Sequence, residues 1–294
     1  AAIKAVALST KFSGTEIALA AKTLVQAGVE TDALPKVLQA TARFAAAADS
    51  DISTAADLIS TVRDVYSELD DNTIANQLTR AVNISKLTAE DLRTILSLGA
   101  QTAQGFNLTS EQYLAAVSTL RNAGIKASTV ATGLRQAMLE IFNPDEKTLK
   151  AFKDRYEQMG ENISQEEIRS RFYSFKYADN PLAAGVAELK RLGFGGESQK
   201  TLQRVFDVRA VNAIQALISN FNELEAASSR ITFGEAAAEA SDVQMRSLAN
   251  SVTNLGAALT VFSAEIMSGP VESLEALADK ATKAIQKLTD LDIK

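Results

Sequence analysis

Apolar residues recur along most of the chain with the three-and-four spacing of amphipathic helices, and no window alternates as a strand would. The stretches 58–69 and 130–141 show this spacing most clearly. We therefore predict an all-α fold, a compact bundle of short helices followed by longer, partly coiled-coil-like helices. The expected helices cover residues 15–27, 32–48, 53–69, 72–83, 89–104, 110–123, 128–142, 145–158, 165–176, 181–192, 198–228 with a break, 235–267 and 271–290.

Local signals mark where these helices start and stop. Ser13, Thr109 and Ser164 each precede a Glu or Gln by three residues, the spacing of a capping box. Asn180 followed by proline fits an N-cap and the first helical residue. A glycine followed by an apolar residue predicts a left-handed C-cap with its apolar contact, and this pattern ends periodic stretches at Gly28, Gly105, Gly124 and Gly193.

Helix length divides the chain into three parts. Short helices with short connections favour antiparallel hairpins, so we expect a compact helical domain at 1–160. Residues 161–206 include a glycine-rich turn and are expected to connect this domain to the rest. Residues 207–294 are expected to form long helices with heptad-like seams.

The last third carries two apolar seams with a/d spacing, joined by a kink at Gly269-Pro270. Residues that flank the first seam are mostly small, which favours close approach of another helix. Two interpretations stay open: self-association through the seams, or packing of ordinary amphipathic helices on the chain's own domain. The seam residues are Met245, Leu248, Val252, Leu255, Leu259, Phe262 and Ile266, then Val271, Leu274, Ile285 and Leu288.

The amino-acid composition limits the kinds of catalytic and metal-binding sites that the chain can form. Hydrophobic residues make up 46% but aromatic residues only 6%, so most apolar side chains are small or aliphatic and suit closely packed helices. The chain has 0 Cys and 0 His, which excludes disulfides, metal sites built on thiolate or imidazole, and Ser-His or Cys-His nucleophiles. We expect no catalytic, cofactor-binding or metal-binding residues.

Charge and hydropathy argue against two kinds of partner. The net charge is -6, with 30 basic residues interleaved among 36 acidic ones, which disfavours a duplex nucleic acid. The longest apolar stretch, 255–267, is shorter than the roughly 18 residues that a membrane span needs, and it contains Glu265. Residues 1–4 show neither an initiating Met nor a signal peptide, so we interpret the chain as a piece of a longer protein.

Two stretches resemble parts of known binding motifs but lack residues that those motifs require. The stretch 49–53 begins like an EF-hand loop, but Thr54 stands where glycine is required and Ser60 where the bidentate Glu should be. It predicts a helix cap instead. The stretch 193–201 ends in Lys-Thr like a phosphate-binding loop, yet Gln199 precedes the lysine and no strand leads in, so we interpret it as a turn.

The basic and aromatic stretch 169–177 could indicate binding of single-stranded nucleic acid by stacking. Ile168, Phe172 and Phe175 lie on one helical face, however, and nearby acidic residues offset the positive charge. Core packing is therefore the favoured interpretation.

A longer pattern of residues extends over most of the chain. Its core is Leu120-Arg121-Asn122-Ala123-Gly124-Ile125, then 131–137 and Asn143-Pro144; upstream it includes 88–92, Gly99-Ala100 and 108–112, and downstream Val205-Phe206 with Ala210 and Ala213. This pattern resembles a known family, the phage tail tape measure proteins of the minor tail protein class. The resemblance extends from about residue 13 to 267, although 126–128 is less glycine-rich than the family usually shows.

The resemblance implies a non-enzymatic virion protein that fills the tail tube, templates tail length and is released during genome ejection. It implies a location in the tail tube lumen or at the tail tip, and in the host cytoplasm during assembly. The implied partners are copies of itself in a low-copy bundle such as a trimer, tail tube and baseplate proteins, and tail assembly chaperones, without sequence-specific nucleic acid binding. A cellular helical oligomerisation or adaptor module is the alternative, and an enzyme is third.

A ruler would need an extended chain. A straight helix gains about 1.5 Å per residue, so the whole segment would span at most roughly 440 Å. The many encoded turns predict that it folds up instead, as a head or plug rather than a graduated ruler.

Overall fold

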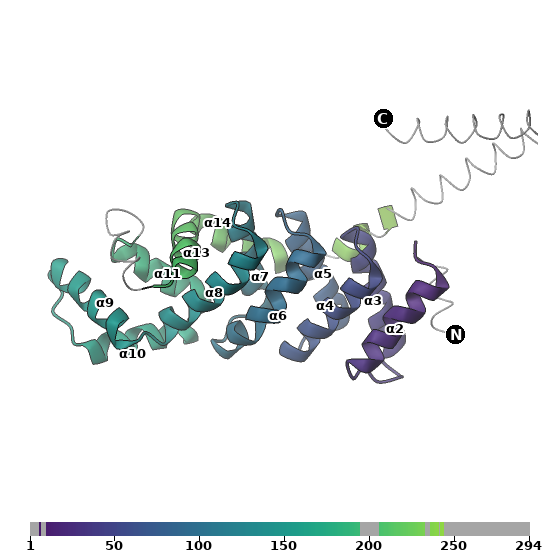
Figure 1. Ribbon diagram of the computed structural model, residues 1–294, viewed down its shortest axis with the longest axis horizontal. Coiled ribbons are helices and arrows are strands. Elements are labelled where there is room, and N and C mark those ends of the chain that lie inside the picture. The colour runs from purple at the N-terminus through teal and green to yellow at the C-terminus, as the bar shows by residue number, and fades with distance from the viewer. Residues whose placement is uncertain (1–5, 7–9, 195–205, 233–235, 241, 244–294) are drawn as a thin grey trace, which may run out of the picture. The chain divides into compact units, whose positions relative to one another are not determined.

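The computed structural model describes residue 6 and residues 10–194, 206–232, 236–240 and 242–243, and the description below is confined to them. Their regular structure is entirely helical, which confirms the all-α prediction (Figure 1). The helices are α2 (Gly14–Gln26), α3 (Leu34–Ala47), α4 (Ile52–Val65), α5 (Asp71–Asn83), α6 (Ala89–Gly105), α7 (Ser110–Asn122), α8 (Ala127–Phe142), α9 (Glu146–Gln158), α10 (Gln165–Ser174), the 3-10 helix η1 (Phe175–Tyr177), α11 (Pro181–Arg191), α13 (Val208–Ser219) and α14 (Phe221–Thr232).

Helices α2 to α8 form two rows. In one row α2, α4, α6 and α8 each contact the next member, and in the other α3, α5 and α7 do the same. Most consecutive helices also contact each other, namely α2 with α3, α3 with α4, α4 with α5, α6 with α7 and α7 with α8. The chain therefore folds as helical hairpins stacked side by side (Figure 1). This is the arrangement of an α-solenoid, in which each hairpin buries its apolar face against its neighbours.

Small residues set the spacing between these rows. A Cβ on Gly99 of α6 would lie 2.0 Å from the hydroxyl oxygen of Tyr113 in α7. The Tyr113 hydroxyl instead crosses α6 and donates to the carbonyl of Ile95 at 3.3 Å. Because no larger residue fits at position 99, the glycine allows a fully buried tyrosine to cross between neighbouring helices.

Helices α9, α10 and α11 enclose a small aromatic cluster. The Phe152 ring stacks on Phe172 with centroids 4.6 Å apart, and Phe194 and Phe206 lie against the same ring. Phe172 is therefore a core residue, as the spacing in 169–177 predicts. The opposite side of that stretch is exposed, with Tyr177 70% accessible.

The chain then returns to the hairpins. Helix α13 packs against α8 and α7, and α14 packs against α7 and α5. By its internal contacts the chain divides into one compact unit at 1–241 and another at 242–294. The expected division at 160 and 206 stays a prediction. Helices α13 and α14 bury their apolar faces in this part of the chain, where they contact α8, α7 and α5.

Most helix ends lie where the sequence predicts. Ser13, Thr109 and Ser164 each form a reciprocal capping box, and the Asn180 side chain caps α11. Helix α4, expected to run to residue 69, ends at Val65. The apolar pattern continues beyond it because Leu69 reaches the core from the following turn.

Three of the predicted glycine caps have the left-handed backbone: φ is 84° at Gly28, 86° at Gly124 and 80° at Gly193. At Gly124 the amide donates to Arg121, and the next amide donates to Leu120, which completes the C-cap.

Gly105 is a correction to the predicted caps. It is the last residue of α6, and Asn107, with φ 61°, takes the left-handed position instead. The amide of Leu108 then closes the cap on the carbonyl of Ala103 at 3.0 Å. The left-handed position therefore lies two residues later than predicted, because buried Leu108, not half-buried Phe106, supplies the apolar contact.

Candidate functional site

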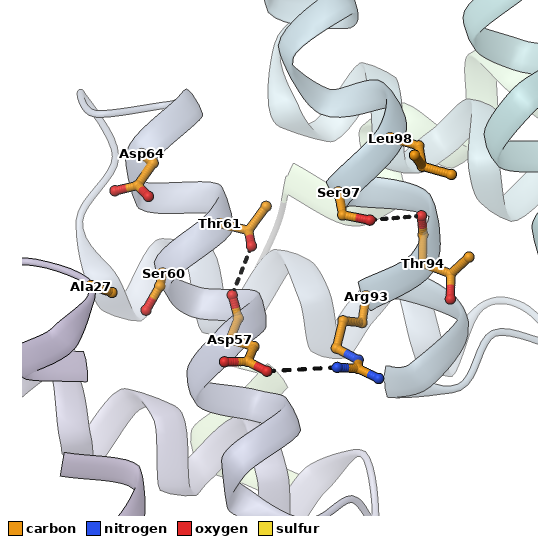
Figure 2. A pocket seen from close by; sticks show the side chains of 9 residues that line it. All are labelled: Ala27, Asp57, Ser60, Thr61, Asp64, Arg93, Thr94, Ser97 and Leu98. Atoms are coloured by element: carbon orange, nitrogen blue, oxygen red, sulfur yellow. Dashed lines mark hydrogen bonds and ion pairs between the residues drawn. The ribbon is translucent and has the colours of Figure 1, made fainter. Parts of the chain in front are cut away.

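The open hollows on the surface show what the molecule offers to a ligand. One has a volume of about 590 Å³ and lies between α4 and α6, beside the end of α2 (Figure 2). Most of its polar side chains bond to the protein itself: the Asp57 carboxylate lies 3.7 Å from the Arg93 guanidinium, and the Thr61 hydroxyl donates to the carbonyl of Asp57. The lining residues are Ala27, Asp57, Ser60, Thr61, Asp64, Arg93, Thr94, Ser97 and Leu98.

A second hollow of about 250 Å³ shares Ala27 and Asp64 with the first. Three of its charged residues have structural partners. The Asp70 carboxylate caps α5, and Arg63 pairs with Asp71. Asp51, at the start of the EF-hand-like stretch, likewise caps α4 by accepting from the amide of Thr54 at 2.7 Å.

Tyr66 and Tyr113 are buried titratable residues in the described part of the chain. Burial raises the pKa of the hydroxyls of Tyr66 and Tyr113, so both stay protonated. Among the described residues no group of three or more acidic, His or Cys side chains is placed to hold a metal ion. Over the same residues, none of the helices combines the length and the hydropathy that crossing a membrane requires.

A polar junction centres on Arg121, at the end of α7. Its guanidinium donates to the carbonyl oxygens of Ile125 at 2.8 Å and Lys86 at 3.2 Å, and to the carboxylate of Asp91 at 2.9 Å. Asp91 also forms a capping box with Thr88 at the start of α6. One side chain therefore joins the end of α7, the connection before α6 and the first turn of α6.

Asn122 completes this junction. Its amide nitrogen donates to the carbonyl of Ile84 at 3.0 Å, and its oxygen accepts from the amide of Lys86 at 3.1 Å. These bonds satisfy backbone groups in the connection between α5 and α6. The Arg-Asn pair in the sequence thus fixes how one hairpin follows the next.

A second close contact lies at Gly133 of α8, where α13 packs against it. A Cβ at this position would lie 2.5 Å from the carbonyl oxygen of Arg209 and 3.5 Å from the Cβ of Ala213. Ala210 and Ala213 are buried against α8. Helices α8 and α13 therefore approach so closely that small residues are required along their contact.

A charged cluster joins α9, α10 and α11. Burial raises the pKa of Tyr156 to about 12, and the hydrogen bond to Glu188 acts in the same direction. The guanidiniums of Arg171 and Arg191 lie 5.4 Å and 5.3 Å from the Tyr156 ring, and both pair with Glu188. Burial opposes ionisation of Glu188, but hydrogen bonds from Arg191 and Tyr156 hold its pKa below the usual value. The cluster therefore holds α9, α10 and α11 together.

The expected seam residues, from Met245 to Leu288, lie outside the described residues. The sequence analysis does not predict the bridging roles of Arg121 and Asn122 or the close contact at Gly133. An isolated glycine within a helical pattern was the available signal for that contact, because glycine there usually has a packing reason.

Comparison with known proteins adds a family. The family model described as phage-related minor tail protein matches residues 1–227. A curated relative, the tape measure protein of Pneumococcus phage Dp-1, is 21% identical over 293 residues, covering 96% of this chain and 24% of that protein. The chain thus spans about a quarter of the length of this relative. No solved structure matches the chain.

Proposed function

Because the chain belongs to the phage-related minor tail protein family, we propose that it is a folded, non-enzymatic segment of a tape measure protein in the virion tail. One observation carries the proposal: the family match at 1–227 covers nearly all of the compact unit at 1–241. The polar side chains of that unit mostly hold helices together. The family membership also leaves the cellular adaptor module without support.

Within the tail, we propose that the segment acts as a head or plug and adds little to the measured length. The support is the stacking of α2 to α8 as hairpins, in which successive helices reverse direction, so the chain gains little length along the helix axes. The same proposal includes a place in the tube lumen or at the tail tip, and release during genome ejection. It also includes contacts with tail tube and baseplate proteins and with assembly chaperones.

Duplication of one hairpin tests this role. Repeating residues 52–83, which hold α4 and α5, adds a unit of the kind that solenoids accommodate. A head or plug predicts tails of unchanged length by electron microscopy, whereas a ruler predicts tails about 50 Å longer. The control is a helical insert of equal length in the same full-length protein, outside this segment, which is expected to lengthen the tail. A tail lengthened by the hairpin as well would contradict the proposal.

We also propose that copies of the chain associate through the seam between Met245 and Ile266. Support comes from its unbroken apolar spacing, since an exposed stripe of that kind needs a cover. Sedimentation velocity of Leu255→Asp with Leu259→Asp is expected to show a dissociated protein. Asn250→Asp with Ala257→Asp adds the same charge on the opposite helical face and should leave the assembly intact. A wild type that is monomeric at high concentration would end this proposal.

A further inference from the structure

The last described part of the first unit runs back along the hairpins, and we name it the strap: α13, α14 and residues 236–240. It contacts α8 and α7 through α13, then α7 and α5 through α14. Its end is fixed to α5 where the amide of Ala237 donates to the side-chain oxygen of Asn76 at 3.0 Å. The strap therefore passes back over helices that precede it by many residues in the chain.

Polar bonds tie the hairpins to one another but hardly tie the strap to them. Arg121 and Asn122 cross from α7 to the connection before α6, and Gln77 of α5 donates to Glu111 of α7 at 2.7 Å. Among the described residues, the strap has one hydrogen bond to the hairpins, the one at Asn76, while its ion pair between Arg230 and Glu223 is internal. The strap also contacts α11, where the Lys190 ammonium lies 5.2 Å from the centre of the Phe221 ring. The strap thus has few directional bonds to the rest of the unit.

Apolar burial holds the strap in place. Such contact is not directional, so a whole element can separate without breaking a network of hydrogen bonds. Each strap helix has 12 residues, and isolated helices of that length are barely stable in water. A separated strap would therefore lose its helical structure. Its large buried side chains are Val211, Ile214, Leu217, Ile218, Leu224 and Ile231.

We propose that the strap opens as one cooperative unit while helices α2 to α7 stay folded, and that opening uncovers the apolar face of α5, α7 and α8. The strap directly precedes residue 242, so a load applied through the later part of the chain reaches it before any other described helix. In this respect the inference rests on the proposed function, since a tail component that leaves with the genome has to unravel in order.

Hydrogen exchange on the full chain tests the opening. In wild type, amides of α13 and α14 are expected to exchange at one common rate, at least about tenfold faster than amides of α4 to α7. A strap that exchanges no faster than α4 to α7 would overturn the proposal, because the unit would then open only by global unfolding.

A pair of variants within the strap sharpens the test. Leu224 is 1% exposed in α14, so Leu224→Ala should speed exchange of α13 and α14 together by at least about tenfold without changing α4 to α7. Val208 is 68% exposed in α13, and Val208→Ala is the matched control expected to change neither region. Equal acceleration of α4 to α7 by Leu224→Ala would contradict a separate strap. These results do not depend on tail length, so they fail or hold independently of the hairpin duplication.

Discussion

The carbonyl oxygen of Arg209 in α13 lies directly against Gly133 in α8, 2.5 Å from where a Cβ would stand. Gly133 lies in the stretch 131–137, which is part of the family resemblance, and Arg209 lies in the strap. The contact therefore joins these two segments. It shows why glycine occupies the middle of a helix, where it costs about 1 kcal/mol relative to alanine. The close approach of the two backbones offsets that cost.

Gly133→Ala is therefore expected to lower the free energy of unfolding by about 1 to 3 kcal/mol, although alanine is the better helix former. The loss arises because the added methyl meets a backbone atom that cannot move aside. Urea unfolding measures it. The control is Gly105→Ala, which meets nothing within 4 Å at the end of α6 and should be neutral or stabilising. A stabilised Gly133→Ala would show that α8 and α13 are farther apart.

Gly124→Val should cost on the order of 1 to 2 kcal/mol, because a β-branched residue resists the left-handed backbone. A Cβ there meets nothing within 4 Å, so backbone strain is the only source of the loss. Thermal unfolding checks the prediction against Gly105→Val, where φ is not positive and little change is expected. Equal losses in both variants would exclude the cap as the cause.

Arg121→Lys is expected to lower the free energy of unfolding by about 1 to 3 kcal/mol. Lysine keeps the positive charge, but its single ammonium group cannot donate to Ile125, Lys86 and Asp91 together, as the planar guanidinium does. Arg93→Lys is the control, because the Arg93 side chain is 47% exposed and solvent screens its ion pairs, so little change in stability is expected. A lysine at position 121 that leaves the urea midpoint unchanged would show that the junction is held by apolar packing alone.

Two carboxylates that share Thr148 should act on stability with opposite signs as pH changes. The backbone hydrogen bond from Thr148 holds the pKa of Asp145 below its ordinary 3.8, so its contribution is present above that value and lost as pH falls through the lowered pKa. Burial raises the pKa of Glu140 above 4.5, so its contribution is present below 4.5 and lost as pH rises through the raised pKa.

Asp145→Asn should therefore destabilise the protein at neutral pH, with a difference from wild type that shrinks in acid. Glu140→Gln should instead stabilise it at neutral pH, and that gain should also shrink in acid. Urea midpoints between roughly pH 3 and 7 measure both. Curves that run parallel to wild type would contradict the assignment.

The sequence predicts features that depend on neighbours in the chain. The Ser13 capping box needs only Glu16 three residues on, and the cap at Gly124 needs only the apolar residue that follows. To predict whether Gly105 or Asn107 takes the left-handed position, one must know which of the following side chains reaches the core. A local pattern does not contain that information. The return of α13 onto α8 depends on how the shapes of two distant segments fit together, so a local pattern does not predict it.

The junction could be recognised from the sequence only in part. The run from Leu120 to Ile125 carries the family resemblance, but its spacing alone does not reveal that Arg121 reaches Lys86 and Asp91. Those partners come close only once α6 and α7 form their hairpin.

Cryo-electron microscopy of intact tails from the phage that encodes this chain tests the central claim most directly. We expect density for residues 14–240 as a folded unit in the tail, with α2, α4, α6 and α8 in one row and α3, α5 and α7 in the other. The same residues traced as one extended helix along the tube, or virions that lack them, would contradict the account.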